Sequence, residues 1–262
     1  MKLFATHGKR SPDPYRIVIS ILLGCAGFAV NFLDIEIAHL PELKLSILAG
    51  LIFPLLVALA WGWKYGLLSA LAGGCQSMWW LWRADGYGLF YAVPVFTLWI
   101  VWHGYWAGVR QRMEEPRWYR SSFAIELPFR LVVELGFFTA FRGLVALNPP
   151  FWDPSITTRT VSMAWLQAMA VKHVISAYVF LMAGHVLLSL TPVRRFFHLP
   201  RERGGRLKNA IYSAAVLLGL LLWWLDSVFT HLWIDPGGRT FWQTLAFDVT
   251  PDRLLMRCLY LV

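Results

Sequence analysis

Residues 50–74 read GLIFPLLVALAWGWKYGLLSALAGG, and this stretch contains one charged side chain, that of Lys64. A helix needs about 20 predominantly apolar residues to cross the hydrocarbon core of a bilayer. The same character extends along the chain, since 58% of its 262 residues are hydrophobic and only 15% are charged. A soluble domain carries about 25% charged residues. The sequence therefore predicts an integral membrane protein.

Repeated apolar windows predict an all-α fold, a polytopic transmembrane helical bundle. Lipid cannot satisfy free backbone donors and acceptors, and the windows are too uniformly apolar for barrel strands. We expect about seven full spans plus the start of an eighth at about residue 252. The expected spans are 17–36, 44–62, 65–82, 87–109, 122–147, 161–190 and 209–234. They divide the chain into a four-span N-terminal half, 1–121, and a C-terminal half, 122–262, with three spans, an outer amphipathic loop and a truncated eighth helix.

Clusters of basic residues predict the orientation of this bundle. They are Lys2, Lys9, Arg10 and Arg16; Arg110, Arg112, Arg117 and Arg120; and Arg194, Arg195, Arg201, Arg203, Arg206 and Lys208. Counting spans places all three clusters on one side, which the positive-inside rule makes cytoplasmic, together with the N-terminus. The opposite loops carry Asp34, Glu36, Glu42, Asp85, Asp153, Asp235 and Asp248. Residues 253–262 supply about half a crossing, so we expect the eighth helix to continue into a cytoplasmic part beyond them.

Two longer stretches carry a family resemblance. The region 31–111 contains the opening stretch and most of YAVPVFTLWIVWHGYWAGVRQR, and residues 223–257 read WWLDSVFTHLWIDPGGRTFWQTLAFDVTPDRLLMR. Both resemble the membrane-embedded sensory region of bacterial sensor histidine kinases and diguanylate cyclases. The resemblance implies a signal-input module in the bacterial inner membrane, a homodimer, and a cytoplasmic output domain outside this chain. The stretch GWKYGLLSALAGG also resembles the substrate-binding membrane subunits of vitamin importers, which is the alternative function.

Ionisable residues inside the apolar windows are the candidate site residues, since each is unfavourable in lipid by a few kcal/mol. The expected depths of Asp226, Arg142 and Lys172 are similar, on the outer side of the membrane. If their helices face one another, they form a polar pocket lined also by His173 and His231. This pocket would bind an unidentified small molecule or lipid. The other interpretation is that Asp226 pairs with a basic neighbour to fix helix packing, while Arg142 and Lys172 extend to the interface.

A second set of charges lies in the expected span 122–147. Glu126, Arg130 and Glu134 are four residues apart and form one stripe of a helix, where opposite charges attract. Such a stripe must face protein or water rather than lipid. It is either a structural ion-pair ladder or a relay through the bundle.

Other functional classes find no support in the sequence. The chain has no catalytic motif, no metal-ligand spacing and no nucleic-acid-binding module, and we expect no cofactor. Its partners are therefore expected to be the lipid bilayer, a second copy of the chain and the unidentified ligand. Glycines such as Gly62, Gly66, Gly73 and Gly74 predict close approach of helices.

Overall fold

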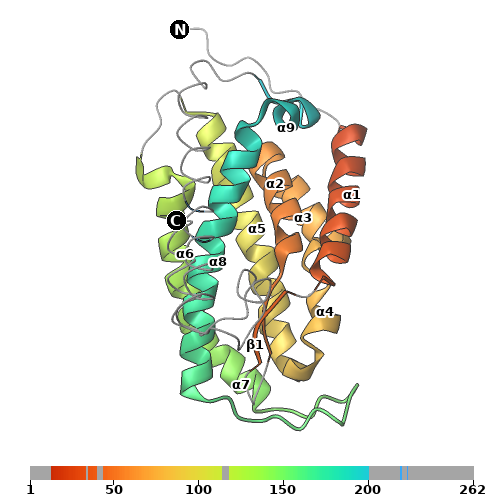
Figure 1. Cartoon of the computed structure of the whole chain (residues 1–262), viewed down its shortest axis with the longest axis vertical. Coiled ribbons are helices and arrows are strands. Elements are labelled where there is room, and N and C mark those ends of the chain that lie inside the picture. Colours follow the sequence, from red (N-terminus) through yellow and green to blue (C-terminus); the bar gives the residue numbers. More distant parts are fainter. Residues whose placement is uncertain are drawn as a thin grey trace, which may run out of the picture.

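A computed structural model describes residues 13–33, 35–39, 44–113 and 118–200, together with the single positions 219 and 223. In these residues, helices run along the long axis of a bundle (Figure 1). The elements are α1 (Pro14–Asn31), β1 (Ile35–His39), β2 (Lys44–Ile47), η1 (Ala49–Leu51), α2 (Ile52–Trp61), α3 (Trp63–Ser69), η2 (Ala70–Gly74), α4 (Met78–Leu81), η3 (Arg83–Gly88), α5 (Leu89–Gln111), η4 (Trp118–Arg120), α6 (Ser122–Gly136), η5 (Phe137–Phe141), α7 (Arg142–Val145), α8 (Met163–Ser189) and α9 (Thr191–Phe196). The turns η2 and η5 are π-helical, and η1, η3 and η4 are 3₁₀ helices.

The predicted fold class is confirmed in its coarse form, because the described chain is helical apart from one short hairpin. Within the described part of the chain, three helices are long and apolar enough to cross a membrane: Pro14–Asn31, Arg83–Gln111 and Trp165–Ser189. A shorter apolar helix covers Ala49–Trp61. The expected seventh span, 209–234, and the start of the eighth lie outside the described residues, apart from positions 219 and 223.

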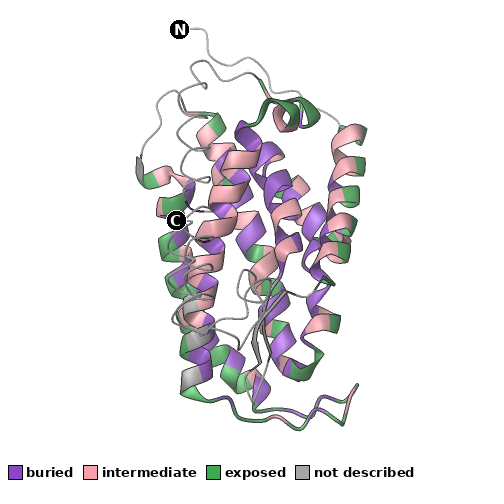
Figure 2. Cartoon of the chain, viewed as in Figure 1, coloured by how far each residue is buried: buried purple, intermediate pink, exposed green. Residues whose placement is uncertain are grey.

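The distribution of polar and apolar side chains on helix α1 is that of a membrane helix rather than of a helix in a soluble protein. Its buried residues are small or polar: Ser20, Gly24, Gly27 and Asn31. Large apolar side chains lie on its outer surface, where Leu22 is 57% exposed (Figure 2). Water would favour the reverse arrangement, whereas lipid accommodates apolar side chains outside and small residues at helix contacts. The distribution of side chains therefore supports a membrane protein independently of helix length.

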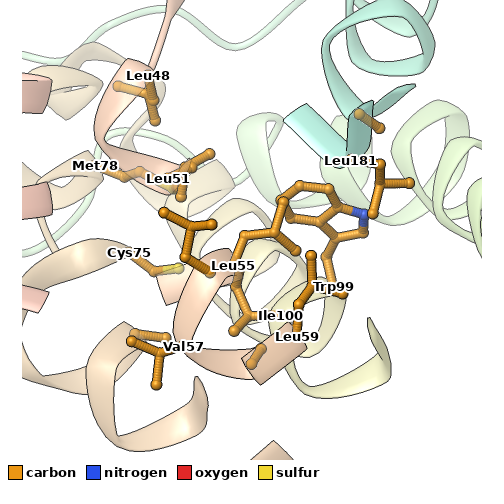
Figure 3. Packing of buried hydrophobic residues seen from close by; sticks show 14 of the residues in the cluster. Leu48, Leu51, Leu55, Val57, Leu59, Cys75, Met78, Trp99, Ile100 and Leu181 are labelled. Atoms are coloured by element: carbon orange, nitrogen blue, oxygen red, sulfur yellow. The ribbon is translucent and has the colours of Figure 1, made fainter. Parts of the chain in front are cut away.

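The centre of the bundle is α2, which contacts α1, α3, α5 and α8. All residues from 54 to 60 are buried, and Leu55 and Val57 have no exposed surface. Around them gather Ile100 of α5 and Leu181 of α8, both fully buried (Figure 3). Lipid is as apolar as these side chains, so close van der Waals packing rather than exclusion from water stabilises this core.

Glycines bring α1 and α2 close to their neighbours. A Cβ atom on Gly27 of α1 would lie 2.7 Å from the carbonyl oxygen of Gly50. Asn31 closes the same contact, because its side chain accepts a hydrogen bond from the Gly50 amide at 2.7 Å and donates one to Ser77 Oγ at 2.8 Å. The close approach predicted for Gly66 and Gly74 is confirmed, since a Cβ there would lie 2.5 Å from Ala58 Cβ and 2.7 Å from Pro54 Cγ, respectively.

Three of the expected spans differ from the observed elements. The span 17–36 was expected to be helical throughout, but α1 ends at Asn31 and Ile35 begins β1. Residues 44–47 form an antiparallel hairpin with β1, in which Ile35 pairs with Ile47 and His39 with Lys44, so the helix of the expected span 44–62 begins only at η1. The expected span 65–82 is interrupted, because Gly73 has φ +154°, outside the helical region. Glycine adopts this conformation without the steric penalty of a side chain.

The described basic residues of the three clusters gather at the end of the bundle that carries α9, here called the basic end (Figure 1). The Tyr15 hydroxyl at the start of α1 donates a hydrogen bond to the carbonyl of Phe196 in α9 at 2.8 Å. At the opposite end, Arg83 pairs with Asp153 at 2.7 Å. Asn148 also orders that end, accepting from the Tyr87 amide at 3.0 Å. The described basic residues of the three clusters therefore share one end of the bundle.

Candidate functional site

The helix α6 carries the charged stripe into the interior of the bundle. It begins after Ser121, whose side chain accepts a hydrogen bond from the Ala124 amide at 3.1 Å. Glu126 and Arg130 lie on its inner face, with 0% and 6% of their surface exposed. The outer face carries Leu131, which is 66% exposed. Of the two environments that the sequence allowed for this stripe, protein or water, Glu126 and Arg130 therefore lie in the protein interior.

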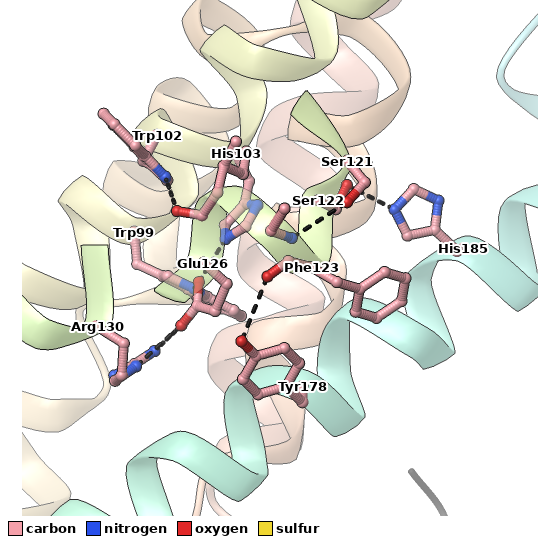
Figure 4. Close-up of polar contacts among 12 residues, drawn as sticks. Trp99, Trp102, His103, Ser121, Ser122, Phe123, Glu126, Arg130, Tyr178 and His185 are labelled. Atoms are coloured by element: carbon pink, nitrogen blue, oxygen red, sulfur yellow. Dashed lines mark hydrogen bonds and ion pairs between the residues drawn. The ribbon is translucent and has the colours of Figure 1, made fainter. Parts of the chain in front are cut away.

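Both oxygens of the Glu126 carboxylate have hydrogen-bond donors (Figure 4). One oxygen accepts from Trp99 Nε1 at 2.9 Å and lies 2.7 Å from His103 Nε2, both on α5. The other accepts from Arg130 Nε at 2.9 Å and Arg130 Nη2 at 2.6 Å. A buried charge is tolerated when it is paired and fully hydrogen-bonded. Glu126 therefore ties α6 to α5 through a saturated set of contacts.

The next carboxylate of the stripe is held much more loosely. Glu134 Oε1 lies 3.6 Å from Arg130 Nη1 and 3.4 Å from His173 Nδ1 of α8. Neither buried oxygen of Glu134 makes a hydrogen bond to the described residues, and His173 Nδ1 makes none either. Buried polar atoms without partners are uncommon in folded proteins. We call the set Glu126, Arg130, Glu134, His103 and His173 the charged column.

Two small cavities flank the column. Arg130, His173, Trp82 and Phe96 line both of them. Each cavity has a volume of about 20 Å³. That space suits a water molecule or two rather than an organic ligand.

Each cavity is also lined by a further acidic or basic side chain. Lys172 of α8 lines the first, and its Nζ lies 5.3 Å from the centre of the Trp82 ring, a cation–π distance. Asp85 of η3 lines the second and is 9% exposed. Ionisable groups of α6, α8 and η3 thus surround a common region inside the bundle.

Polar contacts continue from the column towards the basic end. His185 Nε2 of α8 lies 2.7 Å from Ser122 Oγ, at the first residue of α6 (Figure 4). The Tyr178 hydroxyl donates to the carbonyl of Phe123 at 3.3 Å. α6 therefore contacts α8 on both sides of Glu126, at Ser122 and Phe123 before it and at Glu134 after it. Glu126 itself contacts α5.

Of the outer pocket expected from the sequence, the structure describes Lys172, His173 and Arg142. Lys172 and His173 lie beside the Arg130–Glu134 end of the column. Arg142 is exposed and lines neither cavity, so the structure does not place it with Lys172. Asp226 and His231 lie outside the described residues.

Sequence reasoning missed the α5 half of the site. Trp99 and His103 lie in an apolar window that was expected only to cross the membrane. The available signal was His103 itself, a polar side chain near the middle of that window. Its carboxylate partner lies 23 residues further along the chain, a pairing that no helical period reveals.

Comparisons with known proteins leave the site to be interpreted from its chemistry. No protein-family model, curated protein or solved structure matches this chain. Among the described residues, no three His, Cys, Asp or Glu side chains lie close enough together to hold a metal ion.

Proposed function

We propose that this chain is the membrane-embedded signal-input module of a bacterial receptor, in which the charged column couples α5, α6 and α8. The observation that carries the proposal is the contrast between its two carboxylates. Glu126 is saturated by contacts that join α5 and α6, whereas Glu134 faces α8 with both oxygens lacking a hydrogen-bond partner among the described residues.

This contrast suits a two-state element. A sliding movement of α8 by about 1 Å would bring His173 into hydrogen-bond range of Glu134 or remove it from range, since their present separation is 3.4 Å. Helix shifts of this size are a common means of switching. A stimulus acts through the column when it interacts differently with the two positions of α8.

The importer alternative is less well supported by the interior of the bundle. Pockets for organic ligands usually enclose about 300–1,000 Å³. The two cavities beside the column each have a volume of about 20 Å³. The size of these two cavities therefore disfavours a vitamin-binding site beside the charged column.

The proposal includes a topology. The helical segments α1, α2, α3–α4, α5, α6–α7 and α8 are taken as six of the seven expected spans, in the inner membrane. The basic end and the N-terminus face the cytoplasm, as the positive-inside rule favours. The module acts as a homodimer and relays the stimulus through an eighth helix to a cytoplasmic kinase or cyclase domain.

The test fuses the full chain to the cytoplasmic half of a histidine kinase and measures autophosphorylation in membrane vesicles. Glu134→Gln and His173→Gln are expected to change the phosphorylation level several-fold, because each removes one member of the loose contact. The matched control is Arg142→Gln, an exposed residue that lies in the continuation of α6 and should leave the level unchanged.

Unchanged phosphorylation in both column variants, at normal expression, would refute the input-module proposal. Retention of a radiolabelled vitamin by vesicles containing the unfused chain would support the importer instead.

A further inference from the structure

A hollow at the basic end lies apart from the charged column. It is formed by the ends of α5 and α8, by α9, and by Leu199 and Pro200, which follow α9. The volume of this hollow is about 540 Å³, far larger than that of the cavities beside the column. Its lining residues are Leu59, Ala107, Arg110, Gln111, His185, Leu188, Ser189, Arg194, Leu199 and Pro200.

The charge of this hollow is one-sided. The described lining contains Arg110 and Arg194 but no carboxylate. Arg194 is held in place by backbone acceptors, since Nη1 donates to the Leu188 carbonyl at 3.3 Å and Nη2 donates to the Pro200 carbonyl. Its Nε is buried and has no hydrogen-bond partner among the described residues. Two backbone acceptors therefore fix the orientation of this guanidinium.

The second arginine is positioned in a similar way. Arg110 lies in the last turn of α5 and donates from Nη1 to the Arg120 carbonyl at 3.0 Å. The hollow is thus lined by two guanidinium groups that backbone carbonyls hold in place, and its described lining contains no carboxylate. Planar guanidinium groups match the oxygens of phosphate particularly well.

The depth of the hollow indicates where such an anion would lie. The candidate spans on α5 and α8 end at Gln111 and Ser189, both of which line it. Aromatic side chains occupy the same end, where Trp61 Nε1 donates to the Phe197 carbonyl at 2.9 Å. Indole rings favour the level of the lipid headgroups, and basic pockets between spans at this level bind headgroup phosphates.

We propose that this hollow binds a phosphate group through Arg110 and Arg194. The shared chemistry is that of an anionic lipid headgroup and of free inorganic phosphate. The site does not depend on the signalling role of the column, since none of the five column residues lines it.

The test uses the full chain in nanodiscs of zwitterionic phosphatidylcholine and follows its thermal unfolding. One arm replaces a fraction of the lipid with phosphatidylglycerol, and the other adds inorganic phosphate at constant ionic strength. A raised Tm is expected in at least one arm, because a ligand that binds only the folded state stabilises it. A response to phosphatidylglycerol alone identifies a lipid headgroup, and an equal response to phosphate identifies the free anion.

Variants locate the site. Arg194→Gln and Arg110→Gln should each weaken the apparent affinity by about tenfold, as expected for the loss of a charge-assisted hydrogen bond. Arg195→Gln is the matched control, since Arg195 is the exposed neighbour of Arg194 in α9 and does not line the hollow. Arg110 lies on a different helix, so its variant tests the site even if Arg194→Gln perturbs α9.

Two results would overturn the proposal. One is the absence of any rise in Tm in both arms with the unsubstituted chain. The other is an equal loss of affinity for Arg195→Gln and the two site variants, which would show a general attraction to the basic surface.

Discussion

The Glu126 carboxylate has no exposed surface and is paired with Arg130 on the same helix. Removing one member of a buried pair leaves the other uncompensated, at about 3–5 kcal/mol. Arg130→Gln should therefore lower the free energy of unfolding by about that amount, and so should Glu126→Gln. The double variant Glu126→Gln/Arg130→Gln should lose less than the sum of the two, since neither charge remains alone.

Equilibrium unfolding in detergent, followed by tryptophan fluorescence, measures these differences. Arg142→Gln serves as the reference because its side chain is exposed. Strict additivity of the two substitutions would show that Arg130 is stabilised mainly by another group. An Arg142→Gln variant as unstable as Arg130→Gln would show that the method reports general loss of charge.

Individual residues of the site could be predicted only where helical spacing relates them. The four-residue spacing of Glu126, Arg130 and Glu134 was sufficient to place them on one inward face. No spacing relates that face to His103 or His173, because those contacts depend on how α5 and α8 pack against α6. Equal expected depth was an insufficient guide for Arg142, which was expected at the depth of Lys172 but has an exposed side chain and lines neither cavity.

At the scale of elements, the contact of α1 with η1 depends on the absence of side chains. Gly27→Ala should lower the free energy of unfolding by about 1–3 kcal/mol, the usual penalty of overpacking. The added Cβ would lie 2.7 Å from the Gly50 carbonyl oxygen, which belongs to backbone and cannot move aside as a side chain does. The measurement is the Tm of the purified protein in detergent.

Gly108→Ala is the control for that substitution. It makes the same change in α5, where a Cβ would have no heavy atom within 4 Å. We expect this variant to be as stable as the parent or more stable by up to about 1 kcal/mol, because alanine restricts the unfolded chain more than glycine does. Equal destabilisation at both positions would contradict the proposed role of the close contact.

Elements were predicted best where apolar runs were uniform. The expected spans 87–109 and 161–190 overlap α5 and α8 closely. The hairpin was missed although Ile35 and Ile37 alternate with Glu36, a period of two that favours a strand. The break at Gly73 could not be located from the sequence, since glycine at a helix contact and glycine at a kink look the same.

At the scale of the whole molecule, the two ends of the bundle should lie on opposite sides of the membrane. A reporter inserted after Arg120 or after Arg203 should behave as cytoplasmic, and one near Asp153 as periplasmic. The physical reason is the concentration of arginines at the basic end, which resists translocation. Paired alkaline phosphatase and fluorescent protein fusions measure the side directly.

Reversed signals at all three positions would invert the proposed orientation while leaving the fold unchanged. Equal signals after Arg120 and near Asp153 would show that the α6–α7 segment does not cross the membrane. The charge clusters could predict that the basic regions share one end because a bundle with short connections alternates direction at each span. Which helices touch inside that bundle depends on side-chain packing, which has no comparable pattern in the sequence.

The charged side chains of the segment from α6 to α7 affect how this segment enters the membrane during synthesis. The stretch from Ser122 to Val145 carries Glu126, Arg130, Glu134 and Arg142, and each charge near the centre of a helix disfavours its entry into the bilayer from the translocon by about 2.5–3.5 kcal/mol. This segment is therefore a poor candidate for independent insertion. The partners of Glu126 on α5 are synthesised before it, whereas the His173 neighbour of Glu134 is synthesised afterwards. Efficient insertion of α6 would thus require α5 to remain next to the translocon until α6 is synthesised. His173 could approach Glu134 only later, after α8 has been synthesised.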